Sequence, residues 1–151
     1  MRRIAVVATT AVVLGAGVGM TAVPASAAPA RKVTKSWVTF NGKKGSVWRT
    51  IKVNGKYTRT GQNIVINGWL HDNASNGWSP AVQFRVWQNG QWKHSEYFGV
   101  KYVTSGKPVD RIDYNYGRFW KTTGTHLQVR EAAVKVSNDK NVKFGSWKKL
   151  F

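Results

Sequence analysis

The dipeptide Asn89-Gly90 constrains the fold more than any other feature of this sequence. It separates two runs of alternating residues, 82–88 and 91–97, and it readily takes the two positive-φ positions of a type I′ hairpin turn. A two-residue turn fixes the register of both strands. The pairs predicted outward from the turn are Gln88 with Gln91, Trp87 with Trp92, Arg85 with His94, and Gln83 with Glu96.

Alternation of side chains along a strand then divides this hairpin into two faces. One face carries Trp87, Trp92, Arg85 and His94, and the other carries Val82, Phe84 and Val86. The face with the two tryptophans either meets a ligand or is covered by a second sheet. The hairpin sequence alone leaves both alternatives open.

Turn-forming residues divide the rest of the chain into further short runs that suit strands. These runs are 36–41, 46–53, 57–60, 64–72, 98–104, 109–119, 127–136 and 142–151. Asn54-Gly55 is expected to close a second hairpin, and Gly68 predicts a bulge or a close backbone approach. Short strands with frequent turns predict an all-β fold, a single antiparallel β-sandwich or barrel domain of about seven to nine short strands.

The N-terminus has the three parts of an export signal. Met1-Arg2-Arg3 is basic, residues 4–23 are apolar and small, and Ala25-Ser26-Ala27 is a pattern that signal peptidase accepts. We therefore expect a signal peptide at 1–27 cleaved after Ala27, a flexible basic leader at 28–35 and a β-sandwich domain at 36–151. An uncleaved membrane anchor is the alternative. Because no later run is long and apolar enough to span a bilayer, we expect a secreted protein without a membrane span.

The charge of the chain points to anionic partners. Lys and Arg number 24 against six Asp and Glu, a formal net charge of +18, and removal of the two signal-peptide arginines leaves +16. Such a surplus attracts nucleic acids, anionic wall polymers, and acidic lipid or protein surfaces. Net charge alone does not indicate which of these partners the protein binds.

The sequence has no cysteine, so no disulfide can stabilise the domain. It has eight Trp, five Tyr and six Phe residues, all of them after residue 27. Aromatic side chains each bury on the order of 150–250 Å². We expect aromatic packing to provide the stability that disulfides provide in many small exported domains.

The C-terminal third, THLQVREAAVKVSNDKNVKFGSWKKL after YNYGRFW, resembles the closing strands of small secreted β-sandwich proteins that actinomycetes produce in many versions. The export signal ending in Ala25-Ser26-Ala27 is also similar to theirs. In many of those proteins a cysteine pair joins the two closing strands, one cysteine near Ala132 or Ala133 and one shortly before Gly145. This chain has neither cysteine. Most of those proteins have no assigned activity, so the resemblance implies the fold and little about function.

The sequence offers few groups for catalysis. Its six acids are Asp72, Glu96, Asp110, Asp113, Glu131 and Asp139. A glycosidase needs two opposed carboxylates, for which Asp110 with Asp113 is one choice, but among so many cations we expect salt-bridge or turn partners instead. The three histidines, His71, His94 and His126, lack metal-ligand spacing, and no nucleophile elbow, P-loop or dinucleotide motif occurs. We expect a protein that is not an enzyme and uses no metal or cofactor.

Aromatic and basic residues remain as candidates for binding. The candidate residues are Trp87, Trp92, Arg85, His94, Trp78, Lys43, Lys44, Lys148 and Lys149. Flat indoles suit sugar faces and bases, and Lys and Arg suit phosphates. The alternatives are that each tryptophan packs on the core and that each lysine protects a sheet edge from aggregation.

Two classes of function follow from this composition. The first is a non-catalytic binding module that docks on an anionic or glycan polymer of the cell envelope or extracellular matrix. The second is a partner of another secreted protein, either a protease inhibitor or a subunit of an antibacterial or toxin assembly. Neither the ligand nor the oligomeric state follows from the sequence.

Overall fold

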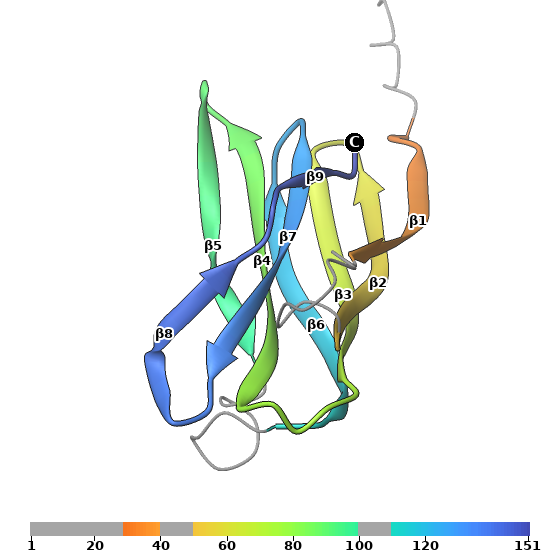
Figure 1. Ribbon diagram of the computed structural model, residues 1–151. Coiled ribbons are helices and arrows are strands. Elements are labelled where there is room, and N and C mark those ends of the chain that lie inside the picture. The colour runs from red at the N-terminus through yellow and green to blue at the C-terminus, as the bar shows by residue number, and fades with distance from the viewer. Residues whose placement is uncertain (1–28, 40–49, 100–109) are drawn as a thin grey trace, which may run out of the picture.

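The computed structural model describes residues 29–39, 50–99 and 110–151, which form two packed antiparallel sheets (Figure 1). The strands are β1 (Lys32–Thr39), β2 (Ile51–Thr60), β3 (Asn63–Asp72), β4 (Trp78–Gln88), β5 (Gln91–Gly99), β6 (Asp113–Thr123), β7 (Leu127–Lys135), β8 (Asn138–Phe144) and β9 (Lys148–Lys149). The predicted all-β fold is confirmed, and of the two predicted architectures the sandwich is the one found. Across the described ranges, no helix is long and apolar enough to cross a membrane.

The first sheet, sheet A, has the strand order β1-β2-β3-β6, and the second, sheet B, has the order β5-β4-β7-β8. The short strand β9 also pairs with β7, on the edge that β8 occupies further along. The run 64–72 becomes β3, which lies inside sheet A between β2 and β6. The hairpin β4-β5 forms one side of sheet B.

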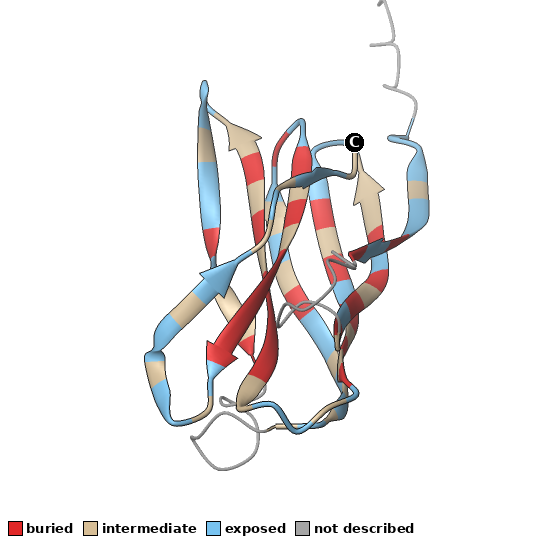
Figure 2. Cartoon of the chain, viewed as in Figure 1, coloured by how far each residue is buried: buried red, intermediate tan, exposed pale blue. Residues whose placement is uncertain are grey.

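The main core lies between the two sheets, where aliphatic side chains surround a group of aromatic rings that join them. Figure 2 shows the buried positions recurring along the strands as strand periodicity requires. Phe84 of β4 is fully buried, with its ring centroid 5.5 Å from Trp37 of β1 and 5.7 Å from Phe119 of β6. Phe98 of β5 lies 6.1 Å from Phe84. These rings connect sheet B to both edge strands of sheet A, as expected for a domain without disulfides.

The hairpin around Asn89-Gly90 forms as predicted near its turn. Asn89 has a φ of 52° and Gly90 a φ of 76°, both in the left-handed region. The structure confirms three predicted pairs, Gln88 with Gln91, Trp87 with Trp92, and Arg85 with His94.

The fourth predicted pair of the hairpin is wrong, because Gln83 pairs with Tyr97 and not with Glu96. A β-bulge shifts the register between Gln83 and Arg85. The buried Ser95 accounts for it, since its hydroxyl accepts the Phe84 N–H at 3.0 Å and its carbonyl accepts the Gln83 Nε2–H at 2.9 Å. The Ser95 side chain thus replaces a backbone partner of β4.

The predicted second hairpin at Asn54-Gly55 is also wrong, because both residues lie inside the continuous strand β2. Gly55 pairs with Gly68 of β3, and a Cβ atom on Gly55 would overlap the Asn67 carbonyl oxygen. A Cβ atom on Gly68 would lie 2.8 Å from the Phe119 ring. Glycine is therefore needed here for close contact between strands and not for a turn, and the close backbone approach predicted at Gly68 is confirmed.

Strand β1 begins earlier than predicted. Lys32 pairs with Thr60 and Lys35 with Tyr57, so half of the expected leader at 28–35 belongs to sheet A. Residues 57–60 of β2 supply the backbone partners for 32–35. The local sequence of 28–35 gives no sign of this pairing, because the pairing depends on the length of β2. The predicted strand parts 40–41, 46–49 and 100–104 lie outside the described residues.

The Gly55–Gly68 contact predicts that Gly55→Ala destabilises the domain. The added Cβ would force backbone movement, so we expect a loss of about 1–3 kcal/mol in the free energy of unfolding. Urea unfolding followed by circular dichroism measures this loss. Gly99→Ala is the matched control, because its Cβ would lie 3.4 Å from the Ala81 methyl group. Equal stability of the two variants would contradict the close approach.

Candidate functional site

The outer face of sheet B carries a series of alternating aromatic and guanidinium groups. We call this series, Trp92, Arg85, Trp147, Arg130 and Phe144, the Trp/Arg ladder. The Arg85 Cζ atom lies 4.5 Å from the centroid of the Trp92 ring and 4.4 Å from that of the Trp147 ring. The Arg130 Cζ atom lies 4.4 Å from the Trp147 ring and 4.0 Å from the Phe144 ring. Each guanidinium therefore makes two cation–π contacts, and Trp147 connects the two arginines.

The strands of sheet B place the ladder residues side by side. Trp92 comes from β5, Arg85 from β4, Arg130 from β7 and Phe144 from β8, so the series crosses the whole sheet. Their positions follow from alternation, because Phe84 and Val129, next to Arg85 and Arg130 in sequence, point into the core. The two arginines consequently lie on the opposite, outer face.

Trp147 reaches this face through an irregularity between β8 and β9. Phe144 pairs with Ala132 and Lys148 pairs with Val129, so three residues, 145–147, stand opposite two residues of β7. The Gly145 N–H donates to the Glu131 carbonyl at 2.9 Å, which holds the chain against β7 at this point. The extra residue breaks strand pairing and leaves the Trp147 indole lying against both arginines.

Two glutamines on neighbouring strands fix the two guanidinium groups. Arg85 donates from Nε and Nη2 to Oε1 of Gln128, at 2.9 and 2.6 Å. Arg130 donates in the same way to Oε1 of Gln83, at 2.9 and 2.6 Å. Each arginine and its glutamine are direct register partners across β4 and β7. Because a glutamine oxygen is neutral, it orients the guanidinium without cancelling its charge, and further N–H donors of each arginine are left for a ligand.

The electrostatics of the ladder favour an anion. Burial lowers the pKa of Arg130, and the nearby charge of Arg85 lowers that pKa further. His94 lies edge-on to Trp147, with ring centroids 5.3 Å apart. Burial lowers the pKa of His94, and the charges of Arg85 and Arg130 lower it further. A bound anion would relieve the repulsion among these groups.

The structure brings together four of the predicted site residues, Trp87, Trp92, Arg85 and His94. The Trp87 and Trp92 rings are in contact at 5.4 Å with an interplanar angle of 74°. Both are only partly buried, and sheet A packs against the opposite face of the hairpin. The alternative that the second sheet covers this face is therefore wrong. Lys149 pairs with Gln128, which places it on the same outer face.

The remaining predicted residues lie away from the ladder face or are not among the described residues. Trp78 packs against the core cluster, with the Lys143 Nζ atom 4.6 Å from its ring, so it belongs to the opposite face of sheet B. This placement follows from β4 starting at Trp78, which puts it in phase with Phe84. Lys148 donates from Nζ to the Val38 carbonyl at 2.7 Å and so links β9 to sheet A. Lys43 and Lys44 lie outside the described residues.

Three members of the ladder, Arg130, Trp147 and Phe144, were not among the predicted site residues. Alternation in 127–136 is a signal for Arg130, because it sets Gln128 and Arg130 opposite Leu127 and Val129. No comparable signal exists for Trp147. Its position depends on one extra residue between two strands, which is a property of the tertiary pairing.

Three of the six acids, Asp72, Asp110 and Asp113, make turn or ion-pair contacts. Asp110 accepts the Asn76 N–H at 3.2 Å and the Gly77 N–H at 2.7 Å. Asp72 is buried, which raises its pKa, and it accepts the Ala74 N–H at 3.2 Å. Asp113 lies 2.8 Å from His71. Within the described ranges no three metal-ligating side chains cluster, and these carboxylates serve as turn and ion-pair partners.

Comparisons with known proteins found no match: no protein-family model, no curated protein and no solved structure is similar to this chain. The resemblance to secreted actinomycete proteins therefore stays a prediction.

The ladder predicts that Arg130→Lys destabilises the domain although the charge is kept. Lysine cannot make the two-donor contact with Gln83 and stacks less well between rings. We expect a loss of about 1–2 kcal/mol in the free energy of unfolding. Chemical denaturation gives this value. The control is Arg118→Lys at an exposed position of β6, and a loss no larger than in that control would show that the ladder contributes nothing.

Proposed function

We propose that this is a small secreted, strongly basic, non-catalytic binding protein that docks on anionic or glycan polymers of the cell envelope or extracellular matrix. The observation that carries this proposal is the pair of glutamine-fixed arginines, Arg85 and Arg130, set between aromatic rings on one outer face. Both side chains are only partly buried, so their charges are near the surface.

This arrangement suits a polymer because net charge provides long-range attraction and the fixed arginines provide short-range contacts. The net charge of +16 that remains after removal of residues 1–27 attracts a polyanion over distances of about a Debye length, roughly 8–10 Å. The fixed guanidinium groups then offer N–H donors to phosphates or carboxylates without a further loss of side-chain entropy. Trp87 and Trp92 add partly exposed flat surface at the end of the hairpin.

The proposed extracellular location is supported by the sequence of residues 1–27, which has the basic start, apolar run and small-residue end of an export signal. The absence of cysteine agrees with a fold that relies on aromatic packing in any redox environment. Cleavage after Ala27 is part of this proposal.

A second candidate function is docking on another secreted protein, as a protease inhibitor or a subunit of an antibacterial or toxin assembly. The observation that favours it is the position of the Trp87–Trp92 pair on an edge hairpin, since among the strands that the structure describes β5 pairs only with β4. Exposed edge strands and tryptophans are common features of protein contacts.

Salt dependence separates the two candidates. We expect the chain without residues 1–27 to bind isolated cell walls or an anionic wall polymer at low salt and to be released as salt rises. The measurement is a pull-down from wall material and from culture fluid at low and high ionic strength. Salt-resistant capture of a protein would favour the second candidate, and absence of any binding at low salt would contradict both.

Paired charge removals test whether the ladder face is responsible. The double variant Arg85→Gln/Arg130→Gln should lose most of the polymer binding. The double variant Lys32→Gln/Lys35→Gln, which removes equal charge from exposed positions of β1, should lose much less. Circular dichroism confirms folding of both proteins, and Lys149→Gln provides a milder charge removal on the ladder face.

The position of His94 predicts how polymer binding depends on pH. The pKa of His94 is lowered from its ordinary value of 6.5, so the ring becomes charged only below that pH. Protonation adds a positive charge beside Arg85, and binding of a polyanion should therefore strengthen as the pH falls below 6.5. His94→Gln should show a smaller increase over the same range, measured with the same polymer at constant ionic strength. Identical pH profiles would exclude His94 from the binding face.

A further inference from the structure

A separate groove lies on the outer face of sheet A, on the opposite side of the sandwich from the Trp/Arg ladder. It has a volume of about 380 Å³ and is bounded by side chains from β1, β2 and β3. The side chains relevant to binding are Val38, Lys52, Asn54, Lys56 and Trp69. This volume is within the range of small-molecule sites, roughly 300–1,000 Å³.

Strand register explains why these side chains share one face. Val38 of β1 pairs with Asn54 of β2, and Asn54 pairs with Trp69 of β3, so the three form one row across the sheet. Their sequence neighbours Val53 and Leu70 are buried in the core, which directs the row outward. Trp69 is only partly buried and provides the largest flat surface of the row.

The two lysines lie at opposite ends of the groove. Lys52 and Lys56 flank Asn54 on β2 at two-residue intervals, which separates their Cα atoms by roughly 13 Å. Both are exposed. An occupant of the groove therefore meets an indole and an amide at the centre and a positive charge at each end.

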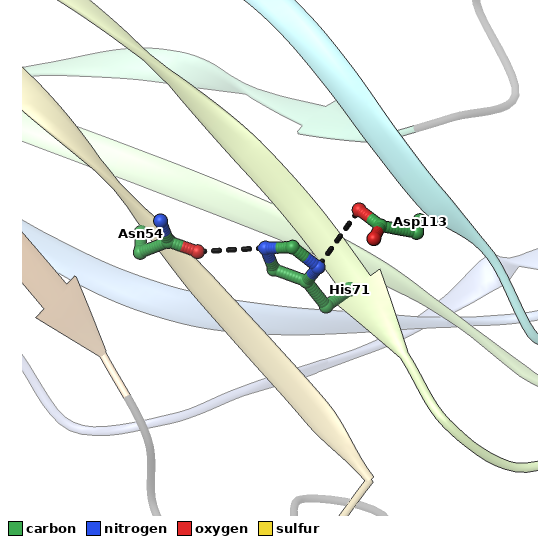
Figure 3. Close-up of polar contacts among 3 residues, drawn as sticks. All are labelled: Asn54, His71 and Asp113. Atoms are coloured by element: carbon green, nitrogen blue, oxygen red, sulfur yellow. Dashed lines mark hydrogen bonds and ion pairs between the residues drawn. The ribbon is translucent and has the colours of Figure 1, made fainter.

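His71 fixes the amide of Asn54 in the groove (Figure 3). The His71 ring contacts Asp113 through Nδ1 at 2.8 Å and Oδ1 of Asn54 through Nε2 at 2.8 Å. Because one end of the Asn54 amide is engaged by His71, the amide is held in place and its other end is left for a ligand. The groove thus presents an oriented amide and two lysine charges, which suit a ligand that carries both hydroxyl and anionic groups.

We propose that this groove binds an acidic saccharide, a sugar ring that carries a carboxylate or phosphate. The ring would lie on the Trp69 indole, its hydroxyl groups would hydrogen-bond to the Asn54 amide, and its anionic group would pair with Lys52 or Lys56. Charge complementarity selects an acidic sugar over a neutral one. The groove contains none of the ladder residues, so this proposal does not depend on the function proposed for sheet B.

Titration calorimetry with soluble sugars tests the proposal. The probes are trigalacturonic acid, its uncharged methyl ester, glucose 6-phosphate and inorganic phosphate. We expect at least one acidic sugar to bind, and the methyl ester and phosphate alone to bind at least about tenfold more weakly. Equal binding of the methyl ester, equal binding of phosphate, or no binding of either acidic sugar would overturn the proposal. Tighter binding of a short single-stranded oligonucleotide would also overturn it.

Matched variants locate the binding on the molecule. Trp69→Ala and Lys52→Gln/Lys56→Gln should each weaken the acidic sugar at least about tenfold. Lys135→Gln/Lys140→Gln, which removes equal charge from exposed positions of sheet B, should bind as the unaltered protein does. Lys52→Gln/Lys56→Gln should retain most of the salt-dependent wall binding, which separates this site from the ladder. Should Trp69→Ala fail to fold, the exposed lysine variants decide the outcome, and unchanged binding by them would overturn the proposal.

Discussion

The contact between aromatic rings across the two sheets is the interaction on which this structure depends. Phe84 of sheet B touches Trp37 and Phe119 of sheet A, and Phe119 in turn lies against the glycine pair of β2 and β3. No covalent link can hold the sheets together, because the sequence has no cysteine. The separation of the sheets, and with it the position of both outer faces, is therefore set by how these rings pack.

The two outer faces use different means to present polar groups. On sheet B, charge is held in place by rings and glutamines, so the arginines of the ladder are both structural and available. On sheet A, the polar side chains line a groove, and a histidine and an aspartate orient the one central amide. A sandwich suits this division, because each strand sends alternate side chains to the shared core and to one outer surface.

Local sequence predicted the features that depend on neighbouring residues. The turn at Asn89-Gly90, the placement of Trp87, Trp92, Arg85 and His94 on one face, and the all-β fold all follow from alternation and turn chemistry. Whether that face lies outward or under the second sheet did not follow from the sequence, because it depends on which side of the hairpin sheet A packs against. The failures each depend on another strand. Gly55 was assigned to a turn because its contact with Gly68 of β3 is not visible in sequence, and the register of Gln83 changed because Ser95 supplies a side-chain acceptor. Trp147 was missed because a bulge opposite β7 determines where its indole lies.

The last residues of the chain have a consequence for the timing of folding. Trp147 completes the contacts between the two arginines, the Phe151 ring lies 5.1 Å from that of Tyr57, and Lys148 donates to the carbonyl of Val38, which lies 110 positions earlier. A polypeptide that is synthesised or threaded through a pore from its N-terminus presents these groups after all the other strands. Until they emerge, the earlier strands expose part of their apolar surface and the two arginines lack their shared ring. The earlier strands must accordingly stay unaggregated until residues 147–151 are available to pair with them.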